Sequence, residues 1–157
     1  MGHAIEAGWF LLNEALKTGD TELKKTAIKH FINGSYNRGW DEKNGGLFYF
    51  LDADDLSPVQ LEWGMKLWWP HAEAIIAFLM AFQSTGEQHF ATVFDKVFSY
   101  TLEKFSDPAM GEWYGYLTRE NQLNQDFKAG PYKGCFHVPR ALMMCEMMLK
   151  QMLDKNN

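Results

Sequence analysis

Three histidines recur at nearly equal intervals along the chain, each at the start of an apolar segment: His3, His71 and His137. Each has a charged neighbour within three positions, and these neighbours are Glu6, Glu73 and Arg140. Imidazole titrates near neutral pH, so it can both remove and return a proton under physiological conditions. If successive repeat units each deliver one such pair, the pairs can line a common pocket. The pattern therefore indicates an acid–base active site.

The first pair, His3 and Glu6, has the i, i+3 spacing that places two side chains on one face of a helix. The carboxylate could orient the imidazole or share a substrate contact with it. The positive end of a helix dipole disfavours an imidazolium in the first turn, which keeps the ring neutral as a general base requires. A capping or core histidine is the alternative at this position.

The second pair, His71 and Glu73, follows two adjacent tryptophans, Trp68 and Trp69. At i, i+2 the two polar side chains diverge, which favours a packing role for this segment. Flat indole rings at a pocket edge also suit stacking against the C–H groups of a sugar. The sequence leaves both interpretations open.

The third segment, GPYKGCFHVPR, carries His137 and Arg140, with Cys135 two residues before the histidine. A cysteine–histidine nucleophile pair is an alternative here. A cysteine two residues before the histidine, at the entry to a helix, need not contact the imidazole, so acid–base chemistry is favoured.

A zinc site formed by His3, His71 and His137 is disfavoured, because the chain lacks the short His/Cys spacings typical of such sites. No metal is expected. The two other histidines, His30 and His89, fall on amphipathic segments and are expected in solvent.

Five helices are expected to position these residues. Residues 3–17, 69–84 and 138–153 are densely apolar, whereas residues 20–36 and 87–105 are amphipathic. A glycine-rich, aromatic stretch follows each amphipathic helix, at residues 40–55 and 111–122. Such a stretch is typical of a β-hairpin or a long loop.

This alternation predicts an all-α fold of the (α/α) toroid type. A helix that is apolar all round must be covered on every side, whereas an amphipathic helix faces water. Three inner and two outer helices make about half of a ring, with the hairpin loops at one rim. Because an open arc exposes apolar faces, the chain is expected to be part of a longer protein or to close by association.

The bulk properties agree with a single packed domain. The chain has 157 residues, 46% of them hydrophobic, and a net charge of −5 without a basic stripe, so nucleic acid is not an expected partner. No apolar run reaches the roughly 18 residues of a membrane span, and the N-terminus does not resemble a signal peptide. Cys135 and Cys145 are expected to be reduced, which indicates a cytoplasmic protein.

The segments GHAIEAGWFLL, LEWGMKLWWPHAEAIIAFLM and KGCFHVPR resemble the N-acylglucosamine 2-epimerase (renin-binding protein) family. The resemblance extends over essentially the whole chain. It implies an (α/α)6 barrel, of which residues 1–157 would form the C-terminal part of a single domain.

The resemblance also implies an activity, the interconversion of N-acetylglucosamine and N-acetylmannosamine through proton removal and return at C2. Two bases are needed, one on each face of the open-chain sugar, and the family motifs place them at His3 and His137. The substrate-binding residues implied are Glu6, Trp69, His71, Glu73 and Arg140. No cofactor is required; ATP as an allosteric effector, a homodimer and a renin-type protein partner are further implications.

Three alternatives remain at this stage. A related aldose–ketose isomerase or a cellobiose-type 2-epimerase would share the barrel and the histidines. A non-catalytic fragment with a renin-type binding role would need no turnover. Because the N-terminal half of the family fold is missing from this sequence, we expect the isolated chain to be inactive.

Overall fold

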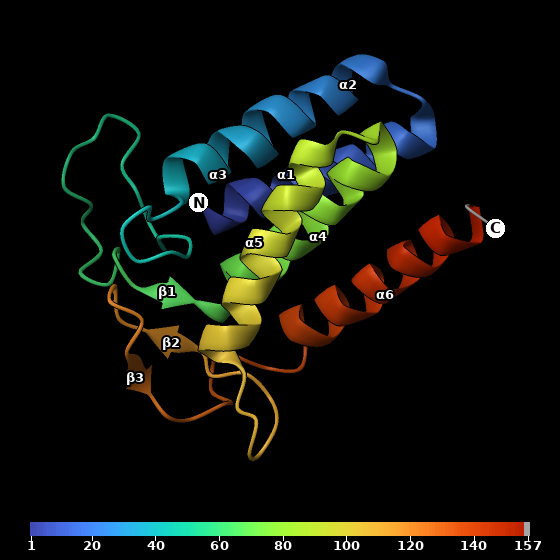
Figure 1. Cartoon of the computed structure of the whole chain (residues 1–157). Coiled ribbons are helices and arrows are strands. Elements are labelled where there is room, and N and C mark those ends of the chain that lie inside the picture. Colours follow the sequence, from blue (N-terminus) through green and yellow to red (C-terminus); the bar gives the residue numbers. More distant parts are fainter. Residues whose placement is uncertain (156–157) are drawn as a thin grey trace.

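Figure 1 shows the computed structural model of the chain, which describes residues 1–155. Its helices, in chain order, are α1 (Gly2–Thr18), α2 (Thr21–Thr26), the π-helix η1 (Ala27–Asn33), α3 (Gly34–Gly39), α4 (Trp68–Thr85), α5 (Gln88–Phe105) and α6 (His137–Lys155). Its strands are β1 (Lys66–Leu67), β2 (Tyr116–Leu117) and β3 (Leu123–Gln125). The five expected helices are therefore present, and residues 21–39 form one continuous helical stretch.

Helix α4 forms the centre of the core. All residues from Trp68 to Ala81 are buried, and the helix packs against α1, α5 and α6. In Figure 1 it lies between α1 and α6. A helix without a polar face requires cover on every side, so this placement confirms the prediction for residues 69–84.

The two amphipathic stretches form the outer layer. Helix α5 buries Phe90, Val93 and Val97 towards α4 and leaves Asp95 and Lys96 in solvent. The stretch from α2 to α3 covers α1 in the same way. Inner and outer helices alternate along the chain, as the hydrophobic patterns predict.

One part of the outer layer differs from the prediction. A regular helix was expected over residues 20–36, but Ala27–Asn33 is a π-helix. Its Ile32 is buried against α1, where a Cβ on Gly8 would lie only 2.8 Å from the Ile32 side chain. Apolar periodicity alone does not reveal a single widened turn, because the same residues remain on the buried face.

Helix boundaries follow the local signals. Helices α1 and α4 end at Gly19 and Gly86, which adopt left-handed φ values of 72° and 74°. Between α1 and α2, the Asp20 carboxylate accepts a hydrogen bond of 2.9 Å from the backbone N–H of Leu23. This N-cap satisfies one of the free donors at the start of the helix.

Of the two stretches expected as β-hairpins or long loops, the second forms a hairpin and the first a loop. Strands β2 and β3 pair within residues 111–125, and β1 adds to β2 to give an antiparallel sheet in the order β1-β2-β3. The stretch 40–55 instead makes a single bridge between Trp40 and Leu47. The Asp41 carboxylate accepts backbone hydrogen bonds from Lys43 and Asn44, which turns the chain into a loop before a strand can extend.

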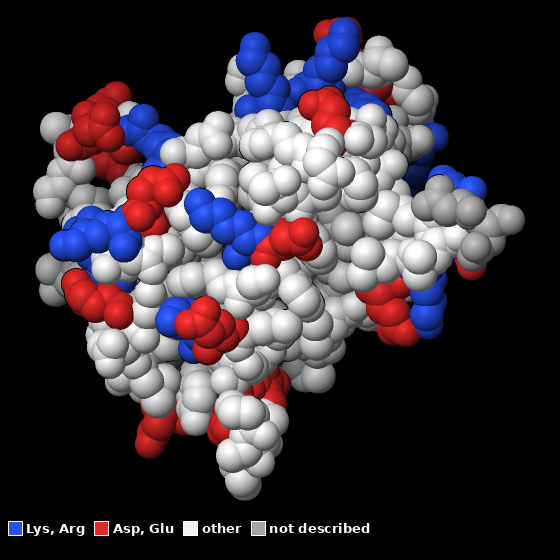
Figure 2. Space-filling model, viewed as in Figure 1, with Lys and Arg blue, Asp and Glu red and all other residues white. Residues whose placement is uncertain are grey.

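The arc of helices is open, as predicted. Helix α6 lies at one end of the arc, and within residues 1–155 no further helix covers its outer side (Figure 1). Its exposed apolar side chains are Leu142, Met143, Met147, Leu149 and Leu153. On the face drawn in Figure 2, acidic and basic side chains are interspersed. None of the helices in residues 1–155 is long and apolar enough to span a membrane.

Candidate active site

The inner helices α1, α4 and α6 begin at one rim of the arc, where a cleft of about 820 Å³ opens. Loops on either side of the sheet and strand β3 complete its walls. The lining is rich in aromatic rings, contributed by Tyr49, Trp68, Trp69, Tyr116, Phe127 and Tyr132. Three polar side chains from the inner helices also line the cleft, namely His3, Glu6 and His137.

The two proposed acid–base histidines both lie close to one indole ring. The centroid of Trp69 is 4.6 Å from that of His3 and 5.6 Å from that of His137. The ring can lie this close to α1 because residue 2 is glycine, where a Cβ would be 2.5 Å from the Trp69 ring. His3, Trp69 and His137 thus come from three different helices and meet in one cleft.

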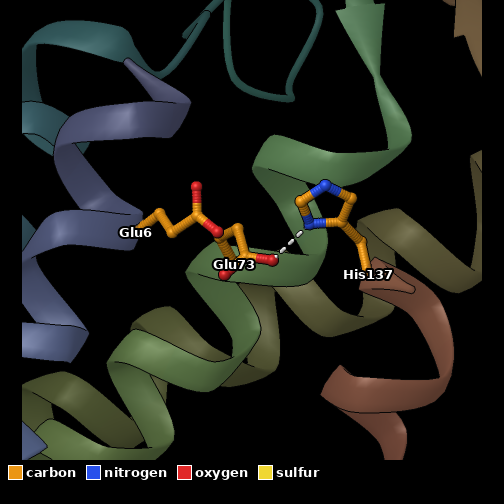
Figure 3. Close-up of side chains that lie close together, drawn as sticks. All are labelled: Glu6, Glu73 and His137. Carbon is orange, nitrogen blue, oxygen red and sulfur yellow. Dashed lines mark hydrogen bonds and ion pairs between the residues drawn. The ribbon is translucent and has the colours of Figure 1, made fainter. Parts of the chain in front are cut away.

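His137 is held by a buried carboxylate. Its Nδ1 lies 2.6 Å from Oε1 of Glu73, which is fully buried on α4 (Figure 3). A carboxylate can only accept, so Nδ1 carries the proton and donates it. In the neutral ring, Nε2 is then unprotonated, which is the form that a general base requires.

Arg140 joins this carboxylate to a second one. Its Nη2 donates to Oε1 of Glu73 at 2.6 Å and to Oε1 of Glu6 at 3.0 Å. Glu6 belongs to α1, so the guanidinium connects all three inner helices. Burial alone would lower the pKa of Arg140, but hydrogen bonds to the two carboxylates outweigh that effect and raise the pKa, so the side chain stays charged.

The same contacts keep Glu73 ionised. Burial alone would raise its pKa, but hydrogen bonds from His137, Trp9 and Arg140 outweigh that effect and hold the pKa below the usual value. A buried carboxylate is stable only when it is paired in this way. Glu73 and Arg140 do not line the cleft; they lie directly behind His137 and act on it.

His71 was expected in the pocket wall, and the structure contradicts this. The ring is fully buried. Its Nε2 accepts a hydrogen bond of 2.9 Å from the backbone N–H of Leu47, and its Nδ1 lies 2.6 Å from the carbonyl oxygen of Leu67. Both nitrogens are therefore occupied by the backbone. At i, i+2 from Glu73, the ring points away from the cleft and fixes the loop that ends at Leu47.

This role predicts a stability effect with a defined pH dependence. Burial lowers the pKa of His71 to about 3, so the unfolded chain binds a proton between pH 6.5 and 3 that the folded chain does not bind. Stability contributed by neutral His71 is complete above pH 6.5 and is lost as the pH falls through this window.

We expect His71→Leu to lower the free energy of unfolding at pH 7 by about 2–4 kcal/mol, because two buried backbone groups lose their partners. At pH 4.5 the difference in unfolding free energy between the variant and the wild type should be about 2 kcal/mol smaller than at pH 7. The wild type loses stability as His71 of the unfolded chain is protonated, whereas leucine does not titrate. Urea denaturation at both pH values measures this, and an equal gap at both would contradict the assignment.

Two carboxylates and one imidazole at the cleft, those of Glu6, Glu73 and His137, also have the composition of a metal site. Ligand atoms of Glu6, Glu73 and His137 lie within 4.8 Å of one another. However, the charged Nη2 of Arg140 already bonds to both carboxylates. A metal ion would have to displace this guanidinium, so the donor set does not fit a resident cation. A zinc site that includes His71 does not fit either, because its ring nitrogens are used by the backbone.

The remaining candidates lie outside the cleft. Cys135 is an exposed free thiol, and Cys145 is buried, which raises the pKa of its thiol to about 12. The two cysteines are unbridged, as the sequence predicts. His30 and His89 are exposed on the outer helices, which also agrees with the prediction.

Comparison with known proteins identifies the family. The profile of the N-acylglucosamine 2-epimerase (GlcNAc 2-epimerase) family matches residues 2–141. The chain belongs to the N-acylglucosamine 2-epimerase family. It is 53% identical over 154 residues to the N-acylglucosamine 2-epimerase of Bos taurus and 52% identical to that of Homo sapiens, covering 98% of this chain in each case. The cellobiose 2-epimerase of Ruminococcus albus is more distant, at 28% identity over 90% of the chain.

Solved structures support the epimerase fold. A D-mannose isomerase superposes with a TM-score of 0.79 at 21% identity, over 96% of this chain, and a cellobiose 2-epimerase from Bacillus thermoamylovorans with 0.73 at 22%, over 95%. This similarity confirms the predicted (α/α) barrel type. In length, the chain spans only 36% of the Bos taurus and human epimerases and 36–37% of the two solved structures.

Membership of the epimerase family does not by itself assign residue roles, and one residue at the site escaped the sequence analysis. Trp9 donates its indole N–H to Oε2 of Glu73 at 2.7 Å. It lies three residues after Glu6, and thus on the same face of α1 as a predicted site residue. That spacing could have identified Trp9 as a site residue. In an apolar helix, however, a tryptophan is also typical of the core, and Trp9 was interpreted as a core residue.

Proposed function

We propose that the chain forms part of a sugar 2-epimerase that interconverts N-acetylglucosamine and N-acetylmannosamine, with His3 and His137 as the two bases. One observation carries the proposal: the two imidazoles lie next to Trp69 in a single cleft, and Glu73 leaves Nε2 of one of them free to accept a proton. A reaction that inverts one carbon through proton transfer needs two such groups.

The proposed chemistry starts from the open-chain sugar. One histidine takes the C2 proton at Nε2; the C2–H electrons form a C1=C2 double bond, and the aldehyde oxygen becomes the oxygen of an enolate whose C2 carries the acetamido group. The other histidine, protonated beforehand, gives its proton to the opposite face of C2, and the electrons return to restore the aldehyde. Atoms and charges balance with two histidines alone, so we propose that no cofactor takes part.

An N-acetylated amino sugar is the proposed substrate. The support is the identity of 53% to an N-acylglucosamine 2-epimerase, against 28% to a cellobiose 2-epimerase. The aromatic lining of the cleft suits the apolar faces of a sugar ring. The similarity to a D-mannose isomerase is at 21% identity and supports the fold only.

Other features of the whole protein are proposed on the family relation alone. These are a homodimer, a response to ATP and a renin-type protein partner. A cytoplasmic location is proposed as well, and the two unbridged cysteines support it.

The test uses a chimera. In it, this chain replaces the matching segment of the Bos taurus N-acylglucosamine 2-epimerase, and the product is assayed with N-acetylglucosamine in D2O. We expect N-acetylmannosamine that carries deuterium at C2. The 157-residue chain assayed alone should show no turnover, because it spans 36% of that relative and its cleft is open on one side.

Each outcome of this test decides between the candidates. A ketose product would support the isomerase alternative. A folded chimera without turnover would support a binding role and contradict the proposal. Epimerisation by the chain alone would contradict the expectation that the rest of the barrel is needed.

A further inference from the structure

The Glu73 carboxylate is held from three sides, and one of its partners has no role in the function proposed above. Two donors, His137 and Arg140, bond to Oε1 at 2.6 Å each. The other oxygen, Oε2, accepts from the indole N–H of Trp9 at 2.7 Å. Glu73 is fully buried and Trp9 is only 4% exposed, so water cannot easily replace this bond.

We propose that Trp9 is a positioning residue for the epimerase reaction, which fixes Glu73 so that the carboxylate holds the Nδ1 proton of His137. This inference rests on the proposed function for its catalytic meaning. If the bond to Oε2 were absent, the carboxylate could rotate about its Cγ–Cδ bond, and Oε1 would no longer be fixed opposite both His137 and Arg140.

Trp9 acts on the guanidinium as well. Its ring lies 5.1 Å from Cζ of Arg140, within the range of a cation–π contact. One side chain of α1 thus bonds to the carboxylate and supports the cation that shares it. The i, i+3 spacing to Glu6 places both on the face of α1 that meets α6 through Arg140.

The hydrogen bond of Trp9 affects His137 through Glu73. The titratable groups around His137 are Glu73 on α4, Arg140 on α6 and Glu6 on α1. His3 lines the same cleft. Of these groups, only Glu73 forms a hydrogen bond with Trp9. Phenylalanine at position 9 keeps an aromatic ring next to Arg140, so the loss of the N–H reaches the imidazole through Glu73.

The closing experiment is an NMR titration of His137 in the 157-residue chain, which requires no activity. In Trp9→Phe an aromatic ring is kept and the donor is lost, so we expect the titration curve of His137 to differ from that of the wild type. Trp40→Phe is the matched control: Trp40 is also buried, but it packs against Tyr36 and Tyr100, away from the cleft. An unchanged titration of His137 in Trp9→Phe would overturn the proposal.

A measurement on the wild type keeps the proposal testable if Trp9→Phe does not fold. The indole N–H resonance of Trp9 should shift with the same pKa as the ring protons of His137, whereas that of Trp40 should not. A Trp9 resonance that is insensitive to this titration would also overturn the proposal.

In the active chimera, Trp9→Phe should lower kcat by about 10-fold, with KM changed by less than about 3-fold, and should shift the acidic limb of the pH profile. An inactive chimera with the expected NMR shift would contradict the proposed function and leave the positioning role in place. An active chimera in which Trp9→Phe changes neither kcat nor the pH profile would contradict the positioning role alone.

Discussion

Replacing His137 with alanine is expected to lower kcat/KM of the active chimera by about 10³-fold, because one of the two proton-transfer groups is lost. His137 is the histidine whose proton state is most clearly defined. Its Nδ1 proton is bound by Glu73, so Nε2 is the only ring atom free to take the C2 proton. No other titratable side chain of the cleft touches Glu73, and none can take over this task.

The fold should survive this change. The side chain of His137 is 20% exposed, and Glu73 keeps its bonds to Arg140 and Trp9. Thermal unfolding of the variant should therefore stay close to that of the parent. His89→Ala, at an exposed position of α5, is the control and should keep full activity. Residual activity of His137→Ala within 10-fold of the parent would exclude His137 as a base.

Replacing Glu73 with glutamine is expected to cost a similar factor, about 10³-fold in kcat, through the proton on His137. Glutamine has nearly the same shape as glutamate but can offer an N–H where the carboxylate only accepts. The position of Oε1 also faces Nη2 of Arg140, which can only donate, so the glutamine oxygen stays there and the amide N–H meets the indole N–H of Trp9. The negative charge that holds the Nδ1 proton of His137 is lost, and a buried donor is left without an acceptor.

Substrate binding should change far less, because Glu73 does not line the cleft. Kinetic assays of the chimera should thus show a fall in kcat with a nearly constant KM. Glu146→Gln is the control: this residue also pairs with a cation, Lys150, but on the exposed side of α6. If Glu73→Gln raised KM and left kcat intact, Glu73 would be part of the binding surface and not the partner of His137.

Much of the fold could be predicted from the sequence because its signals are local. A fully apolar stretch such as 69–84 has to be covered, and the glycines after α1 and α4 end those helices by their own backbone preferences. The loop at 40–55 was predicted less well. Its conformation depends on Asp41, whose carboxylate turns the loop and also pairs with the buried Lys66 at 2.8 Å, a contact between distant residues.

In the candidate site, too, local signals predicted positions correctly, whereas contacts between distant residues were missed. His3 and His137 were placed at helix starts by spacing and motif, and the structure brings them into one cleft. The link from Arg140 to Glu73 joins residues 67 positions apart, and the link from Trp9 to Glu73 joins residues 64 positions apart. No helical spacing encodes such pairs. His71 was misplaced for the opposite reason: its spacing matched the other histidines, but its partners are backbone groups that any sequence would provide.

The π-helix at Ala27–Asn33 gives the outer helix room for one more residue than a regular helix of the same length holds. A π turn holds one more residue than an α turn over nearly the same length of axis, so it absorbs an added residue without changing where the helix ends. The residues after it, including the buried Tyr36 and Gly39, keep their orientation only because this turn is wider. Deleting one residue within 27–33 should therefore give a regular helix in which these residues keep their orientation. An alignment with epimerases whose outer helix is uninterrupted should accordingly place a one-residue gap in this segment.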